Sequence, residues 1–353
     1  MLYGILDSNI RKEIKKAMEK DEIIIRNAII HILDTSVGMP VLSDTVLDLS
    51  PDLNDFIREH IYRLASGDDL KKCQFHEEDS YVYSLLKDFS EENLIPFSQQ
   101  ISNHLYQIMS QNVDIPSADF LVTTFQYQSE LYLAFLKLNY KESFIHLTGE
   151  SDGYNCNDII KYKATLPSGS SKLSEAVLIQ MSTLTPQVIE KKYEINGVKT
   201  NYLSELFLQC KTKLSSKAKL NIVTKAVEQI NQKYYEENFD KHMEAKSIIQ
   251  NELAEEGTLN IETISEKIYG DQPEIKEAFT EKLEKYNIHK EEVTPQSKQT
   301  IRKLEKQFLT TDSGIEINIP MEEYKNPNHV EFITNEDGTI SVLIKNISHI
   351  TTK

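Results

Sequence analysis

The chain has 353 residues, a hydrophobic content of 39%, a charged content of 27% and a formal net charge of −16. This length predicts two or three compact units, and the composition is that of a folded protein and excludes wholesale disorder. The anionic balance argues against a nucleic-acid partner unless cations cluster locally, because binding to phosphates needs gathered Lys and Arg side chains.

The first 90 residues or so mix strand and helix patterns. An isoleucine-rich run at 22–33 predicts a strand, and 41–49 predicts a second extended segment. Ser50 and Pro51 predict the start of a helix that ends at Gly67, because Ser caps helices and Pro suits the first turn. The next predicted elements are an acidic loop at 68–79 and helices at 81–87 and 93–111.

An antiparallel sheet is predicted next. Strands are expected at 120–127 and 130–139, and the short gap between them favours a hairpin. Segments 144–147 and 175–180 are expected to extend the same sheet. Gly149 and Gly153 predict a turn at 149–153, and the dipeptide Asn196-Gly197 predicts a tight turn.

Apolar spacing becomes helical from Tyr202 onward. Leu203, Leu206, Phe207 and Leu214 are expected on one helical face, and the helices that follow are predicted around 222–230 and at 239–255, 261–269 and 273–286. The predicted fold class is α+β, with a mixed N-terminal half built on a mainly antiparallel sheet, a helical middle and a small C-terminal β-hairpin module. Its predicted domains are 1–200, 201–290 and 291–353.

The C-terminal module begins with a basic amphipathic segment at 298–308 and a turn at 311–314. Alternating isoleucines at 315–319 then predict a half-buried strand. Asp337 and Gly338 separate two more apolar runs and predict a tight hairpin, because such turns need positive φ angles.

This C-terminal order resembles the bacterial nucleoid-associated proteins of the NdpA/YejK type. The matching residues are Lys306, Phe308, Ser313, Gly314, Ile315, Ile317 and Asn318, without the second glycine of the family element. A second shared run comprises Leu33, Asp34, Gly38, Pro40, Leu42, Ser43 and Asp44, and shorter likenesses cover most of the chain between the two. The resemblance implies a cytoplasmic, nucleoid-associated DNA-binding protein and implies no catalytic site.

Two groups of cations are the candidate DNA-binding residues. The stretch 209–226 contains no acid and five lysines, which are Lys211, Lys213, Lys217, Lys219 and Lys225. A smaller basic face, interrupted by Glu305, comprises Lys298, Arg302, Lys303 and Lys306. Both groups could follow a phosphate backbone, and both could also be solvated faces of ordinary helices. Few aromatic residues lie between these cations, so stacking on single-stranded bases is not expected.

Other chemistry has weaker support. The cysteines, Cys73, Cys156 and Cys210, are odd in number and widely spaced, which favours a reducing compartment and no zinc site. No GxxxxGK[ST], GxGxxG or HExxH motif occurs, and no cofactor, metal or catalytic residue is predicted. Asp119, Glu130 and Lys137 would be the first residues to test for a hidden metal-dependent nuclease.

The sequence therefore predicts a protein that binds double-stranded DNA mainly through the backbone, with little sequence specificity. An acidic adaptor that nucleoid or DNA-processing proteins recruit is the first alternative, and the cryptic nuclease is the second. A homodimer is expected, with helices between residues 218 and 255 as the contact. The predicted location is the cytoplasmic nucleoid, since the N-terminus has its charges in the wrong order for a secretory signal and no run is long enough to span a membrane.

Overall fold

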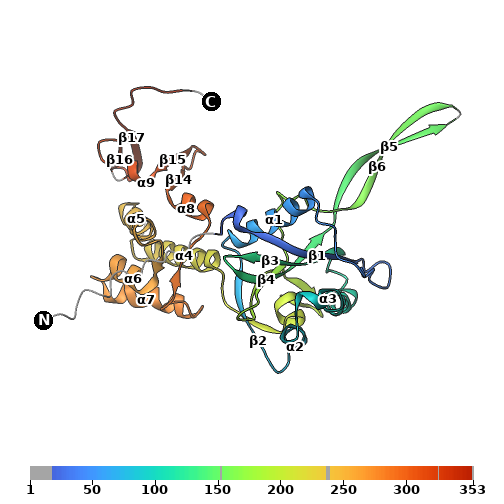
Figure 1. Ribbon diagram of the computed structural model, residues 1–353. Coiled ribbons are helices and arrows are strands. Elements are labelled where there is room, and N and C mark those ends of the chain that lie inside the picture. Colours follow the sequence, from blue (N-terminus) through green and yellow to red (C-terminus); the bar gives the residue numbers. More distant parts are fainter. Residues whose placement is uncertain (1–17, 152, 236–238, 325, 352–353) are drawn as a thin grey trace. The chain divides into compact units, whose positions relative to one another are not determined.

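The computed structural model describes residues 18–151, 153–235, 239–324 and 326–351. The chain divides into two compact units, of which the first is Lys16–Ser215 and the second contains Ser216–Lys353. The α+β fold class is confirmed in both units (Figure 1). The predicted domain boundaries near residues 200 and 290 stay a prediction.

A seven-stranded sheet organises the first unit, with antiparallel pairing throughout and the order β1-β3-β4-β7-β8-β2-β11. Its strands are β1 (Ile24–Leu33), β2 (Lys71–Phe75), β3 (Ala118–Tyr127), β4 (Glu130–Asn139), β7 (Ala176–Gln180), β8 (Thr185–Ile189) and β11 (Cys210–Thr212). The predicted hairpin of β3 and β4 is confirmed, with Tyr127 opposite Glu130.

Helices cover both faces of this sheet (Figure 1). The core on one face contains residues of α1 (Pro51–Ala65), and the core on the other contains residues of α2 (Tyr81–Lys87) and α3 (Leu94–Ser110). Phe120 of β3 enters the α3 core and its neighbour Leu121 enters the α1 core. Because both faces of β3 are covered, all six residues from Phe120 to Phe125 are buried, and they do not alternate between apolar and polar.

The cap predicted for α1 is present. The Leu53 N–H donates to Ser50 Oγ at 3.4 Å, and Pro51 occupies the first helical position. Short elements complete this unit, namely η1 (Lys20–Glu22), η2 (Glu91–Asn93), the π-helix η3 (Leu203–Phe207) and the hairpin of β9 (Tyr193–Ile195) with β10 (Val198–Thr200). Asn196 and Gly197, with φ angles of 51° and 78°, form the turn predicted there.

Three expectations for the first unit were wrong. The stretch 68–79 is not only a loop, because Cys73 and Phe75 alternate inward in β2. Leu203 and Phe207 are buried on η3, but Leu214 follows the strand β11 and shares no helix with them. The segment 144–147 does not extend the main sheet and lies in a separate two-stranded arm of β5 (Lys141–Ser151) and β6 (Tyr154–Thr165), which projects from the sheet (Figure 1).

The second unit begins with four packed helices. These are α4 (Ser216–Tyr235), α5 (Phe239–Glu256), α6 (Ile261–Tyr269) and α7 (Pro273–Glu284), joined by the short pair of β12 (Leu259–Asn260) and β13 (Glu292–Val293). Val223 of α4, Ile249 of α5 and Phe279 of α7 meet in their common core. The apolar faces of α4 and α5 are thus buried inside their own unit.

The C-terminal strands at 316–320, 330–334 and 340–344 match their predicted positions, but a further strand at 306–310 takes the place of the end of the basic amphipathic segment predicted at 298–308. The elements are α8 (Lys298–Leu304), β14 (Lys306–Thr310), β15 (Glu316–Pro320), α9 (Met321–Tyr324), β16 (Val330–Thr334) and β17 (Ile340–Ile344). β14 pairs with β15, and β16 pairs with β17. Gly314 and Gly338 have φ angles of 84° and 81°, so the two turns use the backbone conformation that glycine adopts most easily.

Candidate nucleic-acid interface

Three lysines share one exposed face at the edge of the seven-stranded sheet. β11 is the edge strand, and its register sets Lys211 opposite Gln74 of β2. The Lys213 N–H donates to the Lys72 carbonyl at 2.8 Å, which continues this pairing. Cys210 and Cys73 are buried, whereas the intervening Lys211, Lys213 and Lys72 are exposed, as strand alternation requires. We call Lys72, Lys211 and Lys213 the edge lysines.

Sequence reasoning missed Lys72. Its neighbours at 76–79 are one His and three acids, so the surrounding composition indicated an acidic loop. The available signal was the alternation of Lys72, Cys73, Gln74 and Phe75, which is short but has period two. Only the pairing with β11 shows that this residue lies beside the predicted cations.

The other lysines of the 209–226 stretch belong to α4 in the second unit. The unit boundary lies between Ser215 and Ser216, so the five lysines do not form one helical row. At about 100° per residue, Lys217 and Lys225 lie within roughly 80° of each other on α4, while Lys219 lies on the far side. Lys219 is only 15% exposed and forms an ion pair with Glu291, which reduces its capacity to bind a phosphate.

A second group of cations surrounds the end of α8. Arg302 and Lys303 occupy its last turn, and Lys306 opens β14. All three are exposed, and within the described part of the chain none of them forms an ion pair. Glu305 lies between them and is also exposed. Lys298 begins this helix, and its side chain lies outside the described residues.

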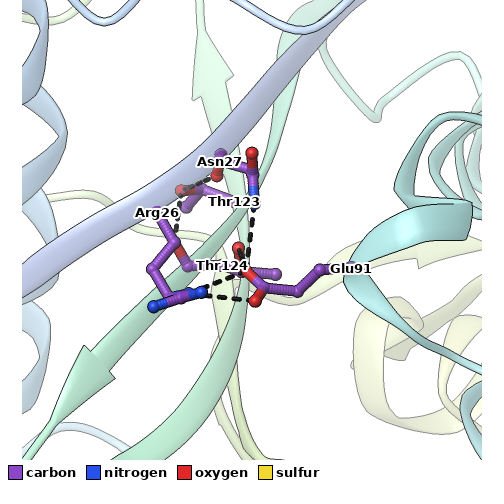
Figure 2. Close-up of polar contacts among 5 residues, drawn as sticks. All are labelled: Arg26, Asn27, Glu91, Thr123 and Thr124. Carbon is purple, nitrogen blue, oxygen red and sulfur yellow. Dashed lines mark hydrogen bonds and ion pairs between the residues drawn. The ribbon is translucent and has the colours of Figure 1, made fainter.

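A charged cluster on the main sheet is closed by its own contacts (Figure 2). Arg26 occupies the register shift between β1 and β3, and its Nε lies 2.9 Å from Glu91 Oε2. Glu91 Oε1 also accepts from Asn27 Nδ2 at 3.0 Å and from Thr124 Oγ1 at 2.7 Å. Burial acts to raise the pKa of Glu91, but hydrogen bonds from Thr124, Arg26 and Asn27 outweigh it and lower that pKa. These contacts fix η2 onto the sheet and leave Arg26 with its charge matched.

The shared N-terminal run, residues 33–44, has a structural role in this fold. Asp34 Oδ1 accepts from the Ser36 N–H at 2.9 Å and from Ser117 Oγ at 3.1 Å, which ties the turn after β1 to β3. Gly38 has a φ angle of 85°. The Ser43 N–H donates to Nδ1 of the buried His31 at 3.1 Å. The 41–49 segment itself makes one isolated bridge, between Val41 and Ile32, and forms no strand.

The residues considered for a nuclease do not meet. Asp119 and Glu130 lie at opposite ends of the β3–β4 hairpin, because Asp119 faces Leu138 and Glu130 faces Tyr127. Lys137 is 1% exposed and its Nζ lies 3.3 Å from Glu175 Oε2. Burial raises the pKa of Asp119, whose carboxylate accepts from Tyr140 Oη at 2.7 Å. In the part of the chain that the structure describes, no group of three or more His, Cys, Asp and Glu residues could hold a metal ion.

One motif was overlooked in the sequence. Residues 149–153 read G-E-S-D-G and have the spacing of a nucleophile elbow, GxSxG. That motif acts on a sharp turn between a strand and a helix, which presents the serine above a buried sheet. Here Ser151 is the last residue of β5, whose partner strand β6 begins at Tyr154, within an exposed two-stranded arm. The surroundings needed for nucleophilic catalysis are therefore missing at Ser151.

Comparison with known proteins gives one result. A protein-family model described as nucleoid-associated protein YejK matches residues 29–350. No curated protein matches the chain. Among the described residues, no helix combines the length and hydropathy that a membrane crossing requires.

Proposed function

Because the chain belongs to the family of nucleoid-associated protein YejK, we propose that it binds duplex DNA through the phosphate backbone with little reading of sequence. Nucleoid association follows from the family itself, and it agrees with the predicted location in the cytoplasmic nucleoid. The contacting residues that we propose are the two groups of cations predicted from the sequence, together with Lys72. These residues are Lys72, Lys211, Lys213, Lys217, Lys219, Lys225, Lys298, Arg302, Lys303 and Lys306.

The observation that carries this proposal is the row of edge lysines. Strand pairing holds the backbones of Lys72, Lys211 and Lys213 in a fixed order, so three like charges project from one face. Their binding releases condensed counterions, with a contribution of about −0.9 per phosphate to the slope of log K against log salt.

Backbone contact is favoured over base reading by the shape of the basic elements. Lys211 lies on the three-residue strand β11, Lys213 follows it and Lys72 lies on the five-residue strand β2, whereas Arg302 and Lys303 lie on a seven-residue helix, α8. Major-groove readers usually insert a longer helix or a two-stranded ribbon whose polar side chains meet base edges. Lysine contacts to phosphates position a protein without conveying sequence. We therefore expect similar affinities for duplexes of different sequence.

The test is fluorescence anisotropy with a labelled duplex of mixed sequence, titrated at salt concentrations from about 50 to 200 mM. Binding should weaken steeply over this range, because each phosphate contact contributes to the salt slope. The variant Lys211→Glu/Lys213→Glu should lose at least tenfold in affinity at low salt, and its salt slope should become shallower by about 2. Reversal of Arg302, Lys303 and Lys306 tests the second unit in the same way.

A matched control changes the net charge equally at other exposed lysines. Lys199 of β10 and Lys285 after α7 are both exposed and lie outside the two groups. Lys199→Glu/Lys285→Glu should retain the affinity and the slope. If the wild-type slope were flat, or if the control lost as much as the Lys211 and Lys213 variant, the site assignment would be wrong. Failure to bind duplex at 50 mM salt would favour the acidic adaptor.

A further inference from the structure

Helices α6 and α7 enclose a groove of about 560 Å³ within the second unit. A groove of this volume is large enough for a small molecule. The buried residues that line it are apolar for the most part and include Ile261, Phe279 and Leu283. Exposed carboxylates of both helices line it as well. The groove therefore combines an apolar floor with a charged rim.

Two polar atoms of the groove lack hydrogen-bond partners. Ser265 of α6 is only 5% exposed, and among the described residues its Oγ makes no hydrogen bond. Nδ1 of His289, which also lines the groove, is buried without a partner in the same described part of the chain. Buried polar groups in folded proteins are nearly always hydrogen-bonded, because an unmet group costs free energy. These two atoms therefore point to a ligand in the groove.

The two ends of the groove differ in charge. At the end next to the turn between the helices, Lys276 of α7 forms an ion pair with Glu266 of α6, and the two charges cancel. At the other end Glu262 of α6 forms no ion pair within the described residues. Glu284 of α7 has His289 beside it, with 3.9 Å between Glu284 Oε1 and His289 Nε2. The unmatched carboxylates thus lie at the end that also contains His289.

Lys290 is the cation that opposes these carboxylates. The Ile261 N–H donates to the Glu291 carbonyl at 3.3 Å, which holds the segment 289–291 beside the start of α6. The exposed Lys290 lines the groove there and offsets one of the carboxylates of Glu262 and Glu284. One negative charge remains at this end when His289 is neutral.

The unmatched groups of the groove are hydrogen-bond acceptors. Carboxylates only accept, and a serine Oγ has two lone pairs. A neutral His289 whose proton is on Nε2, the nitrogen nearest to Glu284, has a lone pair on Nδ1. An ammonium group supplies three N–H donors and a positive charge, so it matches these groups in both hydrogen bonding and charge. An anion would meet like charge at Glu262 and Glu284 and is disfavoured.

We propose that the groove between α6 and α7 binds a free aliphatic diamine or polyamine. One ammonium group binds at Ser265 and His289, a second binds at Glu262 and Glu284, and the methylene chain between them covers the apolar floor. A lysine side chain of another protein has a single ammonium group and could satisfy only one of these two positions. The edge lysines belong to the first unit, so this proposal does not depend on duplex binding.

Isothermal titration calorimetry of the full chain with 1,5-diaminopentane tests this proposal. A ligand of this size at typical efficiency should bind with a Kd of about 1 mM. Pentane-1,5-diol has the same length and no charge, and it should bind at least tenfold more weakly. The double variant Glu262→Gln/Glu284→Gln should weaken diamine binding at least tenfold, and Lys290→Gln should strengthen it.

The variant Ser265→Ala separates ligand binding from folding. It should weaken diamine binding at least threefold, because the buried acceptor is lost. Alanine favours helices and leaves no unmet hydroxyl, so thermal unfolding should show the variant to be as stable as wild type or more stable. Unchanged diamine binding by Ser265→Ala would overturn the placement of the ammonium group.

A matched control removes two charges from α7 outside the groove. Glu274 and Glu277 are exposed and do not line it, so Glu274→Gln/Glu277→Gln should bind the diamine as wild type does. Equal losses in the two double variants would show only a general attraction to an acidic protein and would overturn the proposal. Two further results would do the same. One is the absence of diamine binding up to about 10 mM, which would leave water in the groove. The other is equal or tighter binding of Nα-acetyl-lysine amide, which would favour a protein side chain as the ligand.

Discussion

Acidification is expected to destabilise the first unit through His31. This residue of β1 is fully buried, and its two ring nitrogens have defined roles. Nδ1 accepts the Ser43 N–H at 3.1 Å, so the proton of the neutral ring must be on Nε2. Nε2 then donates to Ser98 Oγ at 3.0 Å, and that hydroxyl donates to the Ile95 carbonyl at 2.8 Å. A second proton would place two N–H groups against each other at Nδ1.

The size of the effect follows from the pKa. Burial lowers the pKa of His31 from 6.5 to about 4. The folded chain therefore keeps this ring neutral while the unfolded chain takes up a proton. The contribution to stability is present in full above pH 6.5 and is lost as the pH falls towards 4. At 1.36 kcal/mol per pH unit, the loss amounts to about 3 kcal/mol.

The variant His31→Asn isolates this contribution. The side-chain oxygen of Asn can still accept the Ser43 N–H, but the residue does not titrate. Urea unfolding should show the variant less stable than wild type at pH 7.5, by about 1–2 kcal/mol for the lost packing and the lost bond to Ser98. The difference should close, or reverse, near pH 4.5. If both proteins lost stability in parallel from pH 7.5 to 4.5, the assignment of a neutral buried ring to His31 would be refuted.

Three further substitutions test polar contacts in the first unit. Lys137→Met removes the ammonium group beside the fully buried Glu175 and should cost about 3–5 kcal/mol in urea unfolding. Tyr202→Phe removes the Oη that donates to Glu175 Oε1 at 2.6 Å, and should cost about 1.5–3 kcal/mol. Glu91→Gln should reduce stability at pH 7, because the lowered pKa of Glu91 stabilises the fold above pH ~4.3, and the difference from wild type should fade on acidification through the pKa of folded Glu91.

Much of the fold could be predicted from local pattern. The hairpin of β3 and β4 and the helix after Pro51 have strong signals in turn and cap residues. The arm could not be distinguished from a sheet strand, because Ile145 and Leu147 alternate as they would in a half-buried strand. Exposure on both faces depends on what the rest of the chain leaves uncovered. No spacing in the sequence encodes that property.

The residues of the candidate site could also be predicted only in part from the sequence. Sequence reasoning found the lysines of residues 209–226 by their lack of acidic neighbours. It could not find the unit boundary at Ser216 or the Glu291 partner of Lys219, since both depend on contacts between distant segments. Pairing of β11 with β2 adds Lys72, which lies about 140 residues earlier, to the edge lysines. The contacts between distant segments therefore change which residues belong to the candidate site, while the site remains a group of lysines that could bind phosphates.

A net charge of −16 and a polyanionic partner are compatible only if the lysines that bind the phosphates are gathered together and set apart from the acidic side chains. Salt screens charges beyond about 8–10 Å, so a phosphate at the edge lysines responds mainly to its immediate neighbours. A homodimer, as the sequence predicts, would give each assembly two sets of edge lysines. Two linked sites bind one duplex more tightly than either site alone, provided that the spacing lets both engage at once. Wild-type protein should then bind duplexes long enough to reach both sets more tightly than short ones. Equal affinities for short and long duplexes in an anisotropy titration would show that only one set of edge lysines engages a duplex at a time.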